Sequence, residues 1–423
     1  MRMRIKKYLL FDDLAKDSLI MFLGTGFTNF FNLLYTVFLT RALLPQDFGV
    51  FNSLLAIMML FSPFPSAITR AFTRFVSQFS AQGKYGEMKK LISLLNRRVF
   101  LIGFVIFLGI MLFHKPFSTF FKIPDGGIFL ILSLMILLSY LSTIPQAILV
   151  GLQKFWYVSL VSFVSGLIKL LLVFVLIKAG AGVMGALGAF FIASFLSLVF
   201  SLYFQQKSLP RVRGLLLENN GFSLGNVYGY LFPVFLVTLA GTAFLNIDII
   251  LVKRFFEPLE AGLYSISQVA GKVVFFFASS LTVVMFPKVA NLQAQNKDTV
   301  VILKKSLFYM FFLSTAVALI AIISPAFMLK ILSGKVYKEC FPLIRMFSVN
   351  MVLLSLIFIF MNYYLSLDKR KYLYIFLSFV ALEIILISLF HNTLIQVLGL
   401  IFVLFLLLLI YNAYLVFYRK QRL

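Results

Sequence analysis

Residues 41–51 read RALLPQDFGVF and residues 254–264 read RFFEPLEAGLY, so the pattern R-x-x-x-P-x-[DE]-x-G-x-[FY] occurs twice, 213 residues apart. Each copy follows an apolar stretch of about twenty residues, the length that an α-helix needs to cross a bilayer. The offset is close to half of the 423-residue chain. The repeat therefore predicts two parallel lobes that enter the membrane from the same side and enclose a central cavity.

We interpret the repeat residues as a structural corner between two helices. Proline and an acid favour the start of the second helix, and glycine allows close packing. The residues of this motif are Arg41, Pro45, Asp47 and Gly49 in the first copy and Arg254, Pro258, Glu260 and Gly262 in the second.

The composition indicates an all-α polytopic membrane protein. Hydrophobic residues make up 62% of the chain and charged residues only 12%, which excludes an ordinary soluble domain. The apolar stretches lack the alternating polarity of a membrane β-barrel. At about twenty residues a span, we expect about twelve transmembrane helices in two six-helix lobes. They lie near 18–40, 48–69, 99–113, 128–150, 157–177, 183–204, 227–252, 261–286, 307–332, 341–367, 372–390 and 394–417.

Three segments follow from this layout: an N-terminal lobe (1–204), a cytoplasmic linker (205–226) and a C-terminal lobe (227–423). The linker ends in the Gly/Asn/Ser-rich patch ENNGFSLGN (218–226). The net charge is +24, and most Lys and Arg lie in loops on the side of the N-terminus. Because cytoplasmic loops carry the excess of basic residues, we predict both termini in the cytoplasm and no nucleic-acid partner.

Charged residues at bilayer depth are the main functional signal, because each costs about 2.5–3.5 kcal/mol and usually faces a cavity or a partner. Lys169, Lys272 and Arg345 outnumber Asp248 and Glu383, so a cavity lined by them favours an anionic head group. Internal ion pairs, such as Asp248 with Lys272, are the structural alternative. The predicted substrate-binding residues of the cavity are Asn29, Asn32, Arg70, Arg74, Lys169, Lys272 and Arg345.

Asp248 and Glu383 are candidates for ion coupling, because a buried carboxylate can carry a proton or a sodium ion. We expect no other cofactor. The chain has one cysteine, Cys340, and two histidines in separate loops, His114 and His391, so no metal site is predicted. Short external loops and the lack of an acid/base cluster argue against an enzyme, such as a membrane glycan polymerase or glycosyltransferase.

The corner motif, AITRAFTRFVSQ (67–78) and NIDIILVKRFFEPLEAGLYSISQVA (246–270) resemble the polysaccharide biosynthesis family. These O-antigen-type flippases of lipid-linked oligosaccharides belong to the multidrug/oligosaccharidyl-lipid/polysaccharide (MOP) exporter superfamily. The resemblance implies a MATE-like fold and assigns Arg74 to the family's basic position and Asp248 to its acidic position. Lys253 or Arg254 takes the basic position after that acid.

The resemblance also implies a function: transport of an isoprenoid-diphosphate-linked glycan across the plasma membrane by alternating access, for the synthesis of cell-surface polysaccharide. Membrane lipids are the other expected partners, and the pathway within one chain predicts a functional monomer. A cation-coupled multidrug exporter of the same superfamily remains the alternative.

Overall fold

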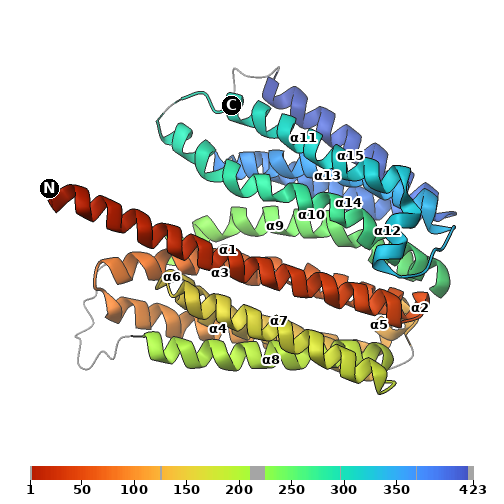
Figure 1. Ribbon diagram of the computed structural model, residues 1–423, viewed down its shortest axis with the longest axis horizontal. Helices are drawn as coiled ribbons and strands as arrows, with labels where there is room; N and C mark the ends of the chain where they lie inside the picture. Colours follow the sequence, from red (N-terminus) through yellow and green to blue (C-terminus); the bar gives the residue numbers. More distant parts are fainter. Residues whose placement is uncertain (1, 124–125, 210–223, 296, 368, 418–423) are drawn as a thin grey trace. The chain divides into compact units, whose positions relative to one another are not determined.

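The computed structural model describes residues 2–123, 126–209, 224–295, 297–367 and 369–417. Within these residues the chain forms fifteen α-helices and no strand. The helices fall into two compact units (Figure 1). An all-helical architecture is expected in a bilayer, because a helix satisfies every backbone hydrogen bond within one segment.

The first unit comprises Met1–Leu39, Phe64–Thr119 and Ile123–Leu231. Within it α8 packs against α6 and α7, and α6 packs against α4. Aromatic side chains join α1 to α7, because the ring of Phe163 meets those of Phe27 and Phe31 edge to face. The helices are α1 (Arg2–Ala42), α3 (Pro63–Ala81), α4 (Tyr85–Leu112), α5 (His114–Phe121), α6 (Gly126–Gly151), α7 (Phe155–Lys178) and α8 (Gly182–Ser208).

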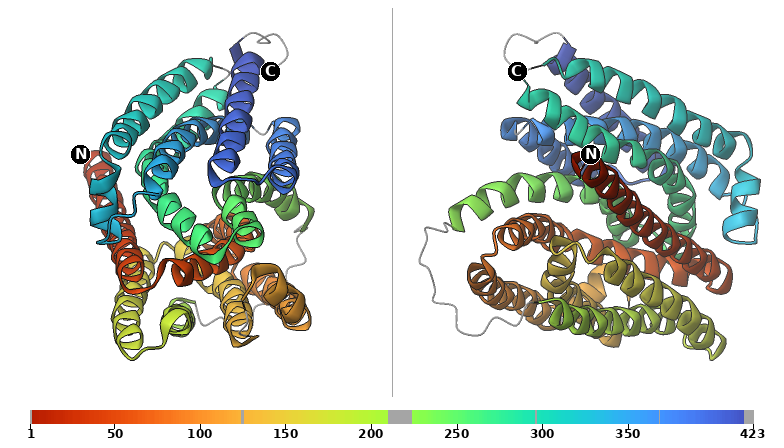
Figure 2. Two further views of the ribbon diagram at one scale, coloured as in Figure 1. Left: turned by 90° about the vertical axis from the view of Figure 1, so that its right-hand side faces the viewer. Right: turned by 60° about the vertical axis from the view of Figure 1, so that its left-hand side comes forward.

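The second unit comprises Thr40–Pro63, Phe120–Lys122 and Phe232–Leu423. Its central helix is α13, which packs against α10, α11 and α15, and Figure 2 gives two further views of this bundle. The short helix α2 packs along α10. The helices are α2 (Pro45–Leu60), most of α9 (Leu224–Phe255), α10 (Pro258–Ala294), α11 (Val300–Ile323), α12 (Pro325–Leu332), α13 (Cys340–Ser366), α14 (Arg370–Leu389) and α15 (Leu394–Phe417).

The prediction of a polytopic helical membrane protein is confirmed. Ten helices of the described residues are long and apolar enough to cross a membrane, and α2 with α3 adds an eleventh if this pair, bent by 43°, is one span. The count of twelve stays a prediction, because α1, which would be the twelfth, is not among these helices. The predicted span 307–332 is divided in two, since α11 ends at Ile323 and α12 begins at Pro325.

The division into lobes at 204 and 227 also stays a prediction. Most of the predicted linker 205–226 lies outside the described residues, because 210–223 are not described. The two compact units are each discontinuous in sequence, since α2 packs in the second unit although it precedes α3 to α8 in the chain.

The two copies of the corner motif touch through their glycines. A Cβ atom on Gly49 would lie 3.0 Å from the Cα atom of Gly262, and a Cβ atom on Gly262 would lie 2.2 Å from the carbonyl oxygen of Pro45. Two residues that the repeat equates, Gly49 and Gly262, therefore lie against each other. Glycine is required because α2 and α10 meet backbone to backbone.

Other motif residues fix the chain around this contact. The Arg41 Nη2 atom donates to the carbonyl oxygen of Ile331 at 2.6 Å, and the Arg254 guanidinium lies 5.2 Å from the centre of the Phe120 ring. At the second corner, the backbone N–H of Glu257 donates to the Glu260 carboxylate at 3.2 Å, which caps the start of α10.

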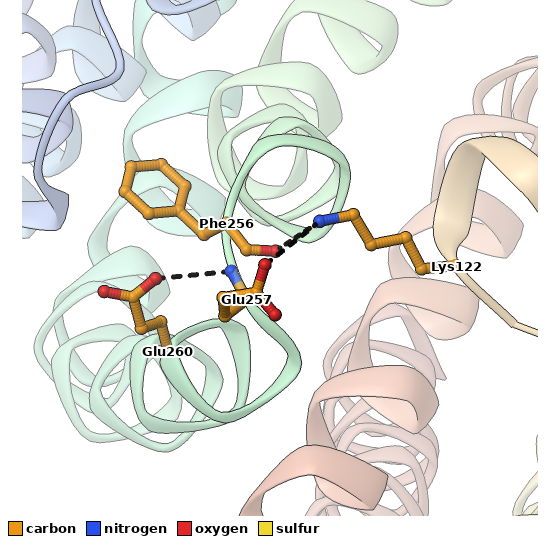
Figure 3. Close-up of polar contacts among 4 residues, drawn as sticks. All are labelled: Lys122, Phe256, Glu257 and Glu260. Atoms are coloured by element: carbon orange, nitrogen blue, oxygen red, sulfur yellow. Dashed lines mark hydrogen bonds and ion pairs between the residues drawn. The ribbon is translucent and has the colours of Figure 1, made fainter.

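Lys122 also holds the second corner. Its ammonium donates to the carbonyl oxygen of Phe256 at 3.1 Å and lies 3.9 Å from the Glu257 carboxylate (Figure 3). The two contacts place a cation at the carboxyl end of α9, where the helix dipole is negative.

We predict that Gly262→Ala destabilises the protein by about 1–3 kcal/mol, because the added methyl group must displace the Pro45 backbone. Thermal unfolding of the purified protein measures the change. The control is Gly399→Ala on α15, where a Cβ atom would meet no atom within 4 Å. Equal midpoints for both variants would contradict the close contact.

Candidate functional site

Lys169 forms the centre of a polar site in the first unit. Its side chain projects from α7, and the residue is only 9% exposed. The ammonium donates a hydrogen bond to the Asn32 side-chain oxygen on α1. It also lies 4.8 Å from the ring centres of both Tyr35 and Phe190. An amide oxygen and two aromatic faces thus stabilise this buried charge, and no described carboxylate lies within 4 Å of it.

The helix α1 presents predicted polar residues next to this lysine. Asn29 and Asn32 are both exposed, and they lie about one turn apart on one face of the helix. Tyr35 is buried on the following turn, and its hydroxyl donates to the carbonyl oxygen of Ala186 at 2.8 Å. The structure therefore brings Asn32 and Lys169 into direct contact, with Asn29 one turn away.

The predicted cavity residues Arg70 and Arg74 lie on α3 of the same unit. Both are exposed, and their spacing of four residues places them on one face of the helix. The opposite face is apolar, with Ile68 and Phe72 buried. This amphipathic pattern orients the two guanidinium groups away from the packed side of α3.

Asp248 forms the centre of a second buried network, in the second unit. The residue, on α9, is 3% exposed. Its carboxylate accepts hydrogen bonds from the Tyr264 hydroxyl at 2.9 Å and from the Gln268 amide at 2.8 and 3.0 Å. The Gln268 side-chain oxygen in turn accepts from the Asn52 amide at 3.1 Å. The network joins α2, α9 and α10 through side-chain hydrogen bonds.

Lys272 does not form the ion pair with Asp248 that was one interpretation of the sequence. Its ammonium donates instead to the Asn246 side-chain oxygen at 3.2 Å. Asp248 lies two residues further along α9, so its negative charge is near Lys272 without a direct contact within 4 Å. In both units, therefore, an intramembrane lysine donates to an asparagine oxygen.

Glu383 and Arg345 have contrasting surroundings in the second unit. Glu383 on α14 is 0% exposed, and neither of its carboxylate oxygens has a hydrogen-bond partner among the described residues. A buried acid without partners is costly when ionised, so this site favours a bound proton or cation. Arg345 on α13 is exposed, and its Nε atom donates to the carbonyl oxygen of Ile322 at 3.2 Å, near the end of α11.

Sequence reasoning missed several of the polar and aromatic partners in these networks. They are Tyr35 and Phe190 in the first unit and Asn52, Asn246, Tyr264 and Gln268 in the second. The repeat could have pointed to two of them. Its offset of 213 residues equates Tyr35 with Asp248 and Phe51 with Tyr264. The same repeat position thus holds a phenol near a lysine in one half and a carboxylate in the other. The repeat could not have pointed to Gln268, because its equivalent in the first copy is the apolar residue Leu55.

Comparison with known proteins identifies the family. The family model described as polysaccharide biosynthesis protein matches residues 14–293, more than half of the chain. The chain belongs to this family. The resemblance predicted from the sequence motifs is thereby confirmed. An uncharacterized membrane protein of Methanocaldococcus jannaschii is 26% identical over 301 residues, which are 66% of this chain and 68% of the relative.

Several solved membrane transporters have a similar fold. The lipid II flippase MurJ in an inward closed conformation has a TM-score of 0.74 at 16% identity, over 94% of this chain and 87% of that chain. An inward-facing multidrug resistance transporter of the MATE family has a TM-score of 0.68 at 13% identity, over 94% and 96%. A MOP transporter from Pyrococcus furiosus has a TM-score of 0.60 at 12% identity, over 96% of both chains.

We predict that Gln268→Leu destabilises the protein by about 1–3 kcal/mol, because Asp248 and Asn52 each lose a buried hydrogen-bond partner. Chemical or thermal unfolding measures the change. The control is Gln78→Leu, at an exposed position of α3.

Adding Asp248→Asn to Gln268→Leu should recover part of this loss, because the carboxylate that lacks its amide partner is then removed. Strictly additive effects of the two substitutions would argue against the network.

Proposed function

We propose that this protein is a flippase that moves a lipid-linked oligosaccharide or polysaccharide precursor across the plasma membrane by alternating access. Its substrate is an isoprenoid-diphosphate-linked glycan, and its role is in cell-surface polysaccharide biosynthesis. The protein works as a monomer among membrane lipids, with both termini in the cytoplasm. The transport cycle involves no covalent step and no enzymatic activity.

The family and the fold support this proposal. The chain belongs to the polysaccharide biosynthesis family, and one of the solved structures with the same fold is a lipid II flippase. Lipid-linked substrates combine a charged head group with an apolar tail, and a membrane carrier must hold the head group away from the hydrocarbon. Charged and amide side chains at bilayer depth are suited to this task.

The buried cation at Lys169 is the observation that carries the proposal. Its partners are the Asn32 oxygen and the Tyr35 and Phe190 rings, which leave the positive charge without a counter-ion among the described residues. A lysine ammonium is a common point-charge ligand for phosphate. Asn29 and Asn32 add amide groups on the same side of α1, and Arg70 and Arg74 add two exposed guanidinium groups to the same unit.

The buried acids support coupling of transport to a proton or sodium gradient. The two carboxylate oxygens of Glu383 have no hydrogen-bond partner within the described ranges, and Asp248 is held by Tyr264 and Gln268 in the same unit. We propose Glu383 as the residue that takes up the ion and Asp248 as the neighbouring negative charge. Lys272 and Arg345 then contribute cationic groups to substrate binding.

A cation-coupled multidrug exporter is the second candidate function. The similarity to the MATE transporter and the buried acids Asp248 and Glu383 favour it. Cationic drugs need an acidic or apolar site, whereas the buried site around Lys169 is electropositive. Transport assays with both substrate classes separate the two functions.

We predict that Lys169→Gln lowers the rate of glycolipid transfer between leaflets by at least about tenfold, because a charge-assisted bond contributes about 1.5–3 kcal/mol. Proteoliposomes with a fluorescent isoprenoid-diphosphate oligosaccharide give this rate. The matched control is Lys178→Gln on the same helix. Lys178 is exposed, and its ammonium lies 4.1 Å from the Phe174 ring centre.

Equal rates for Lys169→Gln and wild type would contradict the binding role of this lysine. Absence of glycolipid transfer by folded wild-type protein, together with gradient-driven efflux of cationic dyes, would overturn the flippase proposal in favour of the multidrug exporter.

We predict that Glu383→Gln removes the dependence of transport on an imposed proton or sodium gradient, while exchange without a gradient continues. The amide is nearly isosteric with the acid but cannot release a proton. Transport with and without each gradient tests this, with Glu339→Gln at an exposed position as the control. Unchanged gradient dependence in Glu383→Gln would exclude this residue from coupling.

A further inference from the structure

An apolar pocket with one cationic wall lies between α3 and α4 in the first unit. Its volume is about 60 Å³. Its apolar lining comes from α3, from α4 and from Leu231 of α9. The α3 residues include Phe64, Ile68 and Phe72, and the α4 residues include Leu95 and Ile102. Arg98 is the one charged residue in the lining, and it is exposed.

The charge pattern of α4 places this pocket at the edge of the hydrocarbon layer. Five charged residues occur between Glu87 and Arg98, whereas Val99–Leu112 contains none. Basic residues at such a boundary lie at the level of the lipid head groups. From Leu95 to Ile102 the pocket extends along seven residues of α4, or about 10 Å at 1.5 Å per residue. We therefore infer that the pocket begins near the head-group level, at Arg98, and continues beside the uncharged part of α4.

The pocket is distinct from the basic residues already assigned to substrate binding. Ile68 and Phe72 of α3 line the pocket, whereas Arg70 and Arg74 lie on the opposite face of this helix at 100° per residue. The surrounding surface is strongly basic, since residues 70–98 contain seven Lys and Arg and one acid. A ligand of this pocket therefore needs a hydrocarbon chain joined to an anionic group.

We propose that the α3–α4 pocket binds an anionic phospholipid, with part of an acyl chain between Ile68 and Ile102 and the phosphate against Arg98. Charge complementarity selects this occupant, because an anionic head group at this level faces a surface with a large excess of positive charge. With the predicted cytoplasmic N-terminus, the bound lipid comes from the inner leaflet. The residues that line this site are not among those assigned above to substrate binding.

Native mass spectrometry of the full-length protein in detergent tests this site, with dioleoyl phosphatidylglycerol and dioleoyl phosphatidylcholine as probes. The wild-type protein should retain one phosphatidylglycerol in preference to phosphatidylcholine. Arg98→Gln should weaken this preference by about fivefold, the loss expected for one basic group beside an anionic lipid. Arg97→Gln is the matched control, because it removes the same charge from the neighbouring exposed position, which does not line the pocket.

A second variant tests the apolar part of the site without changing the charge. Ala71→Leu adds a side chain into the pocket and should lower retention of both phospholipids in folded protein. Equal losses in Arg97→Gln and Arg98→Gln would overturn the proposal, because they indicate a diffuse basic surface. Preferential retention of undecaprenyl phosphate over phosphatidylglycerol, lost in Arg98→Gln, would overturn it in favour of the isoprenoid carrier.

Discussion

The backbones of α2 and α10 touch at Gly49 and Gly262, and the arrangement of the second unit depends on this contact. In a bilayer no hydrophobic force drives helices together, so close packing and hydrogen bonds must hold them. A side chain at either glycine would separate the two helices. The contact places Asn52 of α2 within reach of Gln268 on α10, and Gln268 in turn holds the Asp248 carboxylate.

This arrangement stabilises polar groups that a membrane protein can otherwise hold only at high cost. Asp248 is buried, yet Tyr264 and Gln268 satisfy its carboxylate with hydrogen bonds. Glu383 is equally buried, and in the part of the chain that the structure describes its oxygens lack such partners. The two acids therefore differ in how well they could bind an ion. The carboxylate of Asp248 already accepts hydrogen bonds within the protein, whereas that of Glu383 has no such described partner.

The cations of the two units also differ in what surrounds them. Lys169 is held by an amide oxygen and two aromatic rings, whereas Lys272 donates to Asn246 close to the charge of Asp248. Lys272 therefore has a neighbouring negative charge, whereas no described carboxylate lies within 4 Å of Lys169. Arg98 differs from both lysines, because its side chain is exposed at the end of the charged part of α4.

The sequence by itself determined the class of the protein, its family and the importance of the duplicated corner. These follow from local patterns. The length of the apolar stretches predicts membrane-spanning helices, and the spacing of Arg, Pro, the acid and Gly predicts a corner between two helices. It also indicated which charges lie at bilayer depth. Only the tertiary structure decided their partners, because Asn32 and Lys169 are 137 residues apart in sequence and meet only after α1 and α7 pack together. For the same reason, the pairing of Asp248 with Gln268 rather than with Lys272 depended on helix rotation and packing, which periodicity alone does not fix.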